Sequence, residues 1–157
     1  MQKKLLTGGS MNVIEKVREL LTNYPKISEF TNNIYVDFND ENPTSFGLSS
    51  SGDTLLKEDV LGNQTRQHNF VLYALNQSFN DFDRLSNSTF LLELSYWLER
   101  QKGHPIEVTI DSKTVNGEIT KLSSANGMAY NVPTGDINNG IMYQLQIYAQ
   151  YTLNLED

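Results

Sequence analysis

The chain contains no cysteine, only two histidines and one tryptophan, and no long apolar run. The absence of cysteine excludes disulfides, thiol catalysis and thiolate metal sites. A membrane-spanning helix needs about 20 predominantly apolar residues, and no stretch of the sequence approaches that. The basic first residues are followed only by Leu5 and Leu6, which is too short an apolar segment for a signal peptide. We therefore expect no membrane partner.

Motifs for nucleotide binding and serine hydrolysis are also missing, since no Gly-Lys-Ser, Gly-Lys-Thr or Gly-x-Ser-x-Gly occurs. The segment from Asp37 begins like a calcium loop, but Asn42 replaces the glycine and Leu48 the glutamate that such a loop requires. We interpret His68 as a surface or hydrogen-bonded strand histidine and His104 as a loop residue in a Gly-His-Pro turn. The sequence predicts no catalytic residue, no cofactor and no metal site.

Acidic residues exceed basic ones by 19 to 12, giving a formal net charge of −7 and a pI of about 4.8. A chain of this charge repels nucleic acid and anionic membranes on average. The basic residues are scattered along the sequence, so nothing indicates a surface that reads DNA. Such acidity suits a surface past which DNA slides without binding.

The opening ten residues end in Gly8-Gly9-Ser10, a composition typical of a linker. We expect residues 1–10 to be an added leader and Met11 to be the natural first residue. Residues 11–157 have the length of a single domain, and no internal repeat is visible. A chain of about 150 residues can bury roughly 70% of its unfolded surface, enough for a core without cross-links.

Apolar residues at helical spacing predict a helix over Asn12–Asn23, with Asn12 and Glu15 in the form of a capping box and Pro25 just beyond its end. Period-two alternation predicts strands in the segment that follows. The expected elements there are a strand at Ile34–Phe38, an acidic turn at 39–43, a second strand at Ser45–Leu48, a flexible link at 49–53 and a third short strand at Thr54–Lys57.

Thr65–Gln77 is predicted to be one long strand with apolar residues on both faces. Phe70, Leu72 and Ala74 lie on one face, and Val71, Tyr73 and Leu75 lie on the other. Apolar residues on both faces are typical of a central strand that is covered twice. We expect a helix to cover one face, and either further helix or a neighbouring subunit to cover the other.

Residues 78–84 are predicted to form a polar turn, followed by a helix that is capped by Ser86 or Asn87 and ends near Gln101. Beyond it the chain is predicted to contain only strands and turns. Asn-Gly pairs are a strong hairpin signal, and they occur at 116–117, 126–127 and 139–140. The alternation over 141–153 predicts a last strand with one apolar face and one face rich in glutamine.

The order of these elements carries a resemblance. The helix is followed by Ile34-Tyr-Val-Asp-Phe38, an Asp-Glu-Asn-Pro turn at 40–43, Arg66-Gln67 before Asn69-Phe-Val-Leu-Tyr-Ala74, Asp83-Arg84-Leu85-Ser-Asn87, Leu94-Ser-Tyr-Trp97-Leu98-Glu99, and a strand rich in Tyr and Gln at 143–151. From Met11 onward the chain resembles the tail terminator or minor capsid proteins in the head–tail gene cluster of siphophages and prophages. Residues 103–140 depart from the family pattern, because their turn-rich strands are longer than expected.

The resemblance implies an α+β fold with a mixed, mainly antiparallel sheet and two principal helices packed on one face. Members of this family form a ring, typically a hexamer, on the end of the tail tube. The implied partners are copies of the chain, the tail tube protein and the head connector, with genomic DNA passing through the lumen without sequence-specific binding. The implied location is the head–tail junction of the virion, after synthesis in the bacterial cytoplasm.

Two groups of residues are expected at interfaces in such a ring. Loop residues expected to face a neighbour or the lumen are Asp40, Glu41, Asp53 and Lys57. Residues expected at a subunit or tube contact are Asn80, Asp81, Phe82, Asp83 and Arg84. Two alternatives stay open: a head-completion protein on the portal side, and a small enzyme or ligand-binding domain, which a deep pocket at His68 with a carboxylate partner would favour.

Overall fold

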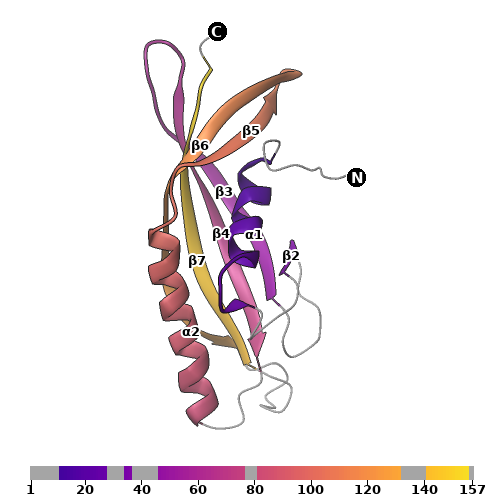
Figure 1. The fold of residues 1–157 in the computed structure, drawn as a ribbon, viewed down its shortest axis with the longest axis vertical. Helices are drawn as coiled ribbons and strands as arrows, with labels where there is room; N and C mark the ends of the chain where they lie inside the picture. The colour runs from indigo at the N-terminus through magenta and orange to yellow at the C-terminus, as the bar shows by residue number, and fades with distance from the viewer. Residues whose placement is uncertain (1–10, 28–33, 37–45, 77–80, 132–140, 156–157) are drawn as a thin grey trace.

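The computed structural model describes residues 11–27, 34–36, 46–76, 81–131 and 141–155. These residues form an α+β fold with two helices and a six-stranded sheet in the order β2-β3-β4-β7-β6-β5 (Figure 1). Along the chain the elements are α1 (Val13–Thr22), β2 (Ile34–Val36), β3 (Phe46–Glu58), β4 (Gln64–Asn76), α2 (Asp81–Glu99), β5 (His104–Ile110), β6 (Lys113–Asn131) and β7 (Ile141–Leu153).

The sheet is mixed but mainly antiparallel, because only β2 runs parallel to its neighbour, β3. Both helices lie on the same face of the sheet (Figure 1). α1 contacts β2 and β5, the strands at the two edges, as well as β7, whereas α2 packs on β6. The sheet must therefore curl around α1 to bring both edges to it. The predicted α+β class with helices on one face is confirmed.

One apolar core lies between the helices and the covered face of the sheet. Tyr24 contacts the rings of Phe90 and Trp97, and Phe90 also packs edge-to-face on Phe46, with 5.8 Å between ring centroids. β7 contributes alternate residues to this core, as its sequence predicts, from Tyr143 to Leu153. Neither helix in the described ranges is both long and apolar enough to cross a bilayer.

The first helix is formed as predicted. The Asn12 side chain accepts a hydrogen bond from the backbone N–H of Glu15 at 2.9 Å, and the Glu15 carboxylate accepts one from the backbone N–H of Asn12 at 3.0 Å. This capping box satisfies two N–H groups that the helix cannot bond internally. The helix also buries Lys16, whose ammonium group lies 3.0 Å from the carboxylate of Glu19.

The expected flexible link at 49–53 is wrong, because β3 runs without a break from Phe46 to Glu58. Residues 49–53 pair with β4, with a register shift between Ser50 and Gly52. Gly52 has a φ of 147°, which side-chain-bearing residues rarely adopt. The serine- and glycine-rich segment is therefore a β-bulge within one strand and not a loop between two strands.

Two of the three predicted Asn-Gly hairpins are also wrong. Both 116–117 and 126–127 lie inside β6, the second at a register shift against β7. The turn between β5 and β6 is made instead by Asp111 and Ser112, with φ angles of 50° and 67°. Positive φ at both central residues is the requirement that favours Asn-Gly in such turns, and here Asp and Ser meet it. The third pair, 139–140, lies outside the described residues.

The polar turn predicted at 78–84 is too long, because its last residues belong to α2, which begins at Asp81 and ends at Glu99. Residues 81–84 therefore belong to the first turn of the helix. His104 is the first residue of β5 and not a loop residue. The expected leader 1–10 and the acidic turn 39–43 lie outside the described residues.

Candidate functional site

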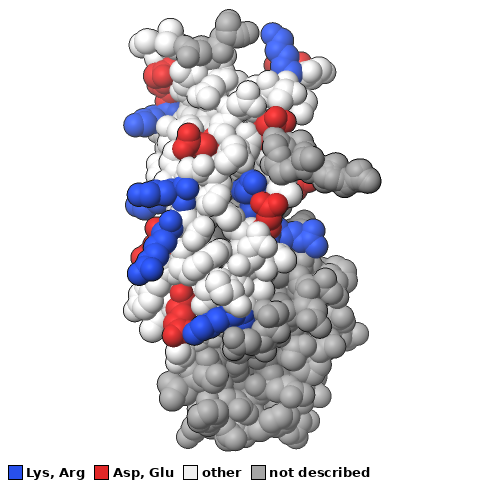
Figure 2. All heavy atoms as spheres, viewed as in Figure 1, with Lys and Arg blue, Asp and Glu red and all other residues white. Residues whose placement is uncertain are grey.

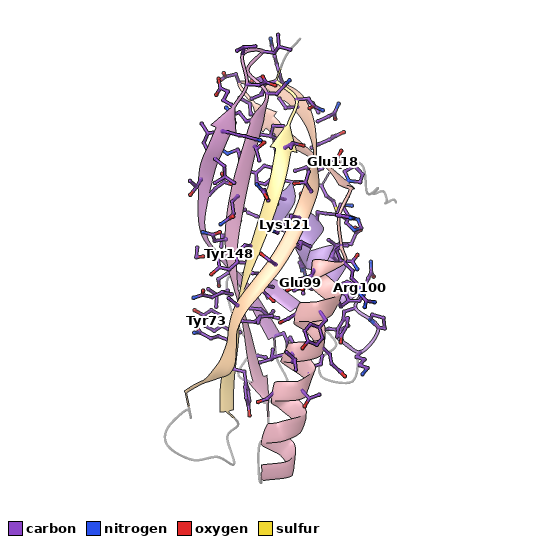
Figure 3. The ribbon with its side chains drawn as sticks, turned by 90° about the vertical axis from the view of Figure 1, so that its left-hand side faces the viewer. Tyr73, Glu99, Arg100, Glu118, Lys121 and Tyr148 are labelled. Carbon is purple, nitrogen blue, oxygen red and sulfur yellow. The ribbon has the colours of Figure 1, made fainter. Side chains whose placement is uncertain are left out.

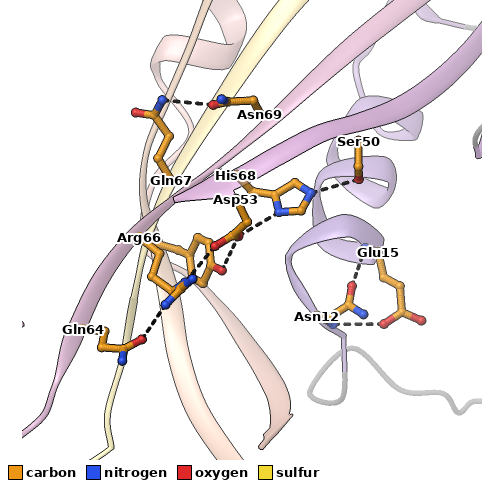
Figure 4. Close-up of polar contacts among 10 residues, drawn as sticks. Asn12, Glu15, Ser50, Asp53, Gln64, Arg66, Gln67, His68 and Asn69 are labelled. Carbon is orange, nitrogen blue, oxygen red and sulfur yellow. Dashed lines mark hydrogen bonds and ion pairs between the residues drawn. The ribbon is translucent and has the colours of Figure 1, made fainter. Parts of the chain in front are cut away.

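A polar cluster joins three adjacent strands on the covered face of the sheet, where the apolar core ends. Phe70 of β4 is buried, but the next residues on that face, His68 and Arg66, are only half-buried. Opposite them are Asp53 on β3 and Tyr151 on β7. We call Ser50, Asp53, Arg66, His68 and Tyr151 the Asp53 cluster (Figure 4).

The bulge in β3 is what assembles this cluster. In a regular strand, residues three apart point to opposite faces of the sheet. The register shift between Ser50 and Gly52 changes this, so that Ser50 pairs with Phe70 and Asp53 pairs with His68. Both side chains consequently reach His68 from the same strand, one at each ring nitrogen.

Asp53 is the centre of the hydrogen-bond network. Its Oδ2 lies 2.8 Å from Nδ1 of His68 and accepts a hydrogen bond of 2.6 Å from the Tyr151 hydroxyl. Its Oδ1 accepts a hydrogen bond of 2.7 Å from Nε of Arg66, which also forms an ion pair with it. One carboxylate thus links β3 to β4 and β7. In the buried part of the same strands, apolar packing holds them together instead.

The ionisation of the cluster follows from these contacts. Partial burial of Asp53 opposes its ionisation, but the hydrogen bonds from Tyr151, Arg66 and His68 outweigh it, so the pKa of Asp53 lies below its ordinary value. Burial and the hydrogen bond to Asp53 raise the pKa of Tyr151. The hydrogen bond to Asp53 likewise raises the pKa of Arg66. The carboxylate is therefore ionised, and the tyrosine and arginine protonated, at neutral pH.

Ser50 completes a Ser–His–Asp arrangement, because its Oγ lies 2.9 Å from Nε2 of His68. In serine hydrolases, histidine takes the serine proton and aspartate orients the imidazole. Catalysis also needs donors for an oxyanion and a site that binds substrate. An open cavity of about 570 Å³ lies at the ends of β3, β4 and β7, but none of the three residues lines it. His68 therefore has the carboxylate partner that an enzyme would need, but it does not line this cavity.

The outcome for the predicted interface residues is mixed. Asp53 is not in a loop but at the centre of the cluster, and Lys57 is an exposed strand residue that lines the cavity. Asp40, Glu41 and Asn80 lie outside the described residues. Residues 81–84 form the first turn of α2. The interpretation of His68 as a hydrogen-bonded strand histidine is confirmed.

The tip of the β3–β4 hairpin is a separate feature that the sequence reading missed. The Asp59 carboxylate caps the turn by accepting hydrogen bonds from the backbone N–H groups of Leu61 and Asn63, at 2.9 and 3.0 Å. These bonds hold the pKa of Asp59 below its ordinary value, against a desolvation effect that acts in the opposite direction. Exposed apolar side chains cluster around this turn, at Leu55, Leu56, Val60 and Leu61.

The face of the sheet turned away from the helices is a second surface of interest, which we call the open face. Tyr73 and Tyr148 project from it on the side opposite α2 (Figure 3). Its residues are half-buried and uncharged, and some bond to each other: the Tyr148 hydroxyl donates to Gln146 at 2.7 Å, and Gln67 donates to Asn69 at 3.0 Å. On β4 and β7 the open face consists of Thr65, Gln67, Asn69, Val71, Tyr73, Gln144, Gln146, Tyr148, Gln150 and Thr152.

His104, the other histidine, lies apart from both surfaces. Its Nε2 is 3.3 Å from the side-chain oxygen of Gln101. Partial burial and the nearby charge of Lys16 lower its pKa, although Glu19 acts in the opposite direction. It is therefore neutral at pH 7. Within the described ranges, no three His, Asp or Glu side chains are grouped so that they could hold a metal ion.

The Asp53 cluster leads to a prediction about acid stability. Asp53→Asn is expected to lower the free energy of unfolding at pH 7 by about 1–2 kcal/mol, because it removes charge-assisted hydrogen bonds to three partners. The folded-state pKa of Asp53 is depressed, so its contribution is complete above the unfolded pKa of about 4 and is lost as pH falls through the folded value. Urea unfolding at pH 7 and near pH 2.5 measures both differences.

The matched control for this prediction is Asp111→Asn, in the exposed β5–β6 turn, where asparagine tolerates the positive φ equally well. It should leave stability at pH 7 within about 0.5 kcal/mol of the parent. A gap between the parent and Asp53→Asn that stayed constant down to pH 2.5 would mean that the Asp53 charge does not stabilise the fold.

No protein-family model matches the chain, and no curated protein is similar to it in sequence.

Proposed function

We propose that this chain is a tail terminator: a structural protein that forms a ring on the end of a phage tail tube and joins the tail to the head. The observation that carries the proposal is that, among the described residues, helices cover only one face of the sheet. Two helices cover one face, while the other presents uncharged Gln, Asn and Tyr side chains to its surroundings. Such a face suits packing against other protein surfaces, and the order of sequence elements supports the same family.

The edges of the sheet favour contact through faces over strand addition. In the described part of the chain β2 pairs with β3 only up to Leu48, so the rest of β3 forms that edge of the sheet. This part of β3 carries register shifts between Ser50 and Gly52 and between Leu55 and Lys57, and bulges twist an edge away from pairing. At the opposite edge, β5 contains Pro105, which has no N–H to donate, and the N–H of Glu107 already bonds the carbonyl of Met11 at 2.8 Å. Side-chain packing is therefore the better route to ring contacts.

The charge distribution suits a ring through which DNA moves. On the face seen in Figure 2, acidic and basic side chains alternate over the described part of the surface and form no basic patch. Cationic contacts to phosphates supply non-specific DNA affinity. A chain with a net charge of −7 and interspersed cations would let DNA pass without holding it. The virion and its head–tail junction are the corresponding location.

The test is binding to tail tubes. The chain would be mixed with tubes assembled from the tube protein of the phage or prophage that encodes it, and examined by negative-stain microscopy. We expect rings on tube ends and tubes that no longer lengthen. A pull-down that retains the portal-side connector but not tube protein would favour the alternative, a head-completion protein. A chain that remains monomeric and binds neither partner would contradict both.

The Ser50–His68–Asp53 arrangement supports a second candidate, acyl transfer. In that reaction Ser50 Oγ would attack an ester carbonyl as its proton moves to His68, the alcohol would leave with that proton, and water would hydrolyse the acyl-serine. Incubation with p-nitrophenyl acetate and with a fluorophosphonate probe tests this candidate. Turnover lost in both Ser50→Ala and His68→Asn would establish an enzyme and remove the purely structural role. We expect neither turnover nor labelling, since none of the three residues lines the cavity at the ends of β3, β4 and β7.

A further inference from the structure

A charged side chain is buried under the first helix. Lys16 lies on the buried stripe of α1 between Val13 and Leu20, and it is the one charged side chain that is buried within the described ranges. Its ammonium group is 3.0 Å from the carboxylate of Glu19, which is itself partly exposed. A buried charge is costly unless an opposite charge compensates it. Under α1, therefore, one cation is balanced by one carboxylate.

His104 faces α1 from the sheet. It is the first residue of β5 and lies two residues before the buried Ile106, so both side chains point to the covered face. The backbone carbonyl of Met11 accepts a hydrogen bond of 2.8 Å from the N–H of Glu107, which fixes the start of α1 against β5. This bond sets the position of the helix relative to the strand.

The directions of the two elements bring Lys16 and His104 to the same level. From the bond between Met11 and Glu107, α1 runs downward in Figure 1, whereas β5 runs upward to it. Lys16 is about 8 Å from Met11 at 1.5 Å per helical residue, and His104 is about 10 Å before Glu107 at 3.3 Å per strand residue. Because α1 contacts β5, the buried ammonium group and the imidazole lie near each other.

The groups around His104 come from three elements. On α1 the charged groups are Lys16 and Glu19. On β6 its partner is the buried and apolar Ile119, and beyond α2 the uncharged Gln101 places its side-chain oxygen 3.3 Å from Nε2. Partial burial, and then the charge of Lys16, lower the pKa of His104, against the opposing effect of Glu19. The environment therefore favours a neutral imidazole.

We infer that the docking of α1 on β5 is a proton-sensitive contact, which is stable while His104 is neutral and is weakened when His104 gains a proton. Protonation places a second cation beside the buried Lys16, and Glu19 is the carboxylate that the described residues supply for both. The inference does not depend on the proposed function. It assigns a conformational response to mild acid to these residues, which we call the α1–β5 contact.

The pH range of the response follows from the direction of the pKa shift. Well above the ordinary histidine value of about 6.5, His104 is neutral whether α1 is docked or not, so it costs nothing. As the pH falls through 6.5, the undocked form takes up the proton first, and the docked form loses stability until the lowered pKa is reached. This range lies above the one in which Asp53 becomes protonated, so the two effects are separable.

We expect α1 to respond before the central strands. It is held by side-chain packing and by the bond from Glu107 to Met11, whereas β4 and β7 pair along their whole lengths. Elements with fewer such bonds open at lower free energies than a central sheet. Proton uptake at the α1–β5 contact should therefore loosen the helix and leave the β4–β7 ladder closed.

Amide hydrogen exchange on the full-length chain tests the inference. Between about pH 7.5 and about pH 5.5, protection factors at Val17, Leu20 and Leu21 should fall by up to about tenfold, the limit for one proton taken up over one pH unit below 6.5. Those at Phe70 and Ile147, in β4 and β7, should not change. Protection factors are corrected for the intrinsic pH dependence of exchange, and circular dichroism verifies folding of each variant.

Three variants identify the groups responsible. His104→Gln, which cannot be protonated, should abolish the fall in α1 protection, and Lys16→Met, which keeps an unbranched stem without the charge, should reduce it. His68→Gln, which removes the other histidine, should leave the fall as in the parent. An equal fall in the parent and His104→Gln would overturn the inference, as would an unchanged fall in Lys16→Met or an equal loss of protection in β4 and β7.

Titration of the histidine ring protons by NMR gives a test that needs no destabilising change. The chain has only two histidines, so the signal missing from His104→Gln identifies His104. In the parent it should titrate below the ordinary value of about 6.5, and Lys16→Met should move its midpoint upward. A parent midpoint at or above the ordinary value would overturn the inference.

Discussion

Replacing Gly117 by alanine is expected to lower the free energy of unfolding by about 3 kcal/mol, the upper range for overpacking in a well-packed structure. Gly117 lies in β6 between Ile106 of β5 and Leu153 of β7. A Cβ at this position would overlap the backbone carbonyl of Thr152. A flexible side chain could move aside, but this carbonyl belongs to the β6–β7 ladder, so relief requires separating two strands.

Asn116→Ala is the matched control, one residue away on the same strand with an exposed side chain. It should change stability by no more than about 0.5 kcal/mol. Urea unfolding followed by tryptophan fluorescence gives the midpoint and slope for both variants. Equal midpoints for Gly117→Ala and Asn116→Ala would show that β6 and β7 are further apart than described, and would argue against the pairing of Gly117 with Leu153.

Gly117 also illustrates why the β5–β6 turn could not be predicted from the sequence. An Asn-Gly pair supplies the positive φ that tight hairpins need, and the sequence reading gave it that meaning at 116–117. In the fold, the glycine is required by the close approach of a neighbouring strand, which depends on residues far away in sequence. The turn itself uses Asp111 and Ser112, whose adoption of positive φ no local pattern indicates.

The elements that could be predicted have continuous patterns confined to one segment. α1 has an uninterrupted apolar stripe and a capping box, and β7 alternates over its whole length. β3 fails this condition, because its buried apolar residues stop at Leu48 and the rest of the strand is mostly polar and exposed, including its two later apolar residues, Leu55 and Leu56. Pairing with β4, a long-range interaction, is what makes that half of β3 a strand.

The candidate site was predictable only in its separate parts. Asp53 was expected at an interface and His68 was expected to be hydrogen-bonded, but nothing in the sequence joins them. The bulge at Gly52 sets which side of β3 Ser50 and Asp53 occupy, and the register of β3 on β4 sets their distance to His68. An isolated glycine within a strand-like segment is the signal that could have indicated the bulge. Tyr151 joins the cluster only through the pairing of β4 with β7.

Phe46→Ala is expected to be the most destabilising single change, lowering the free energy of unfolding by about 3–5 kcal/mol. Phe46 is completely buried and packs edge-to-face on Phe90 of α2, so it links the sheet to this helix. Removing the ring leaves a cavity beside Phe90 of α2 and Ala74 of β4. A loss of this size is a large fraction of the 5–15 kcal/mol that stabilises most domains.

Leu56→Ala provides the control on the same strand, because Leu56 is 46% exposed and should cost no more than about 0.5 kcal/mol. Phe46→Leu should fall between them, since it keeps most of the apolar volume and loses the aromatic contact with Phe90. Thermal unfolding of the three variants gives the order directly. If Phe46→Ala melted with Leu56→Ala, Phe46 would not be in the core, and α2 would not be anchored to β3 as described.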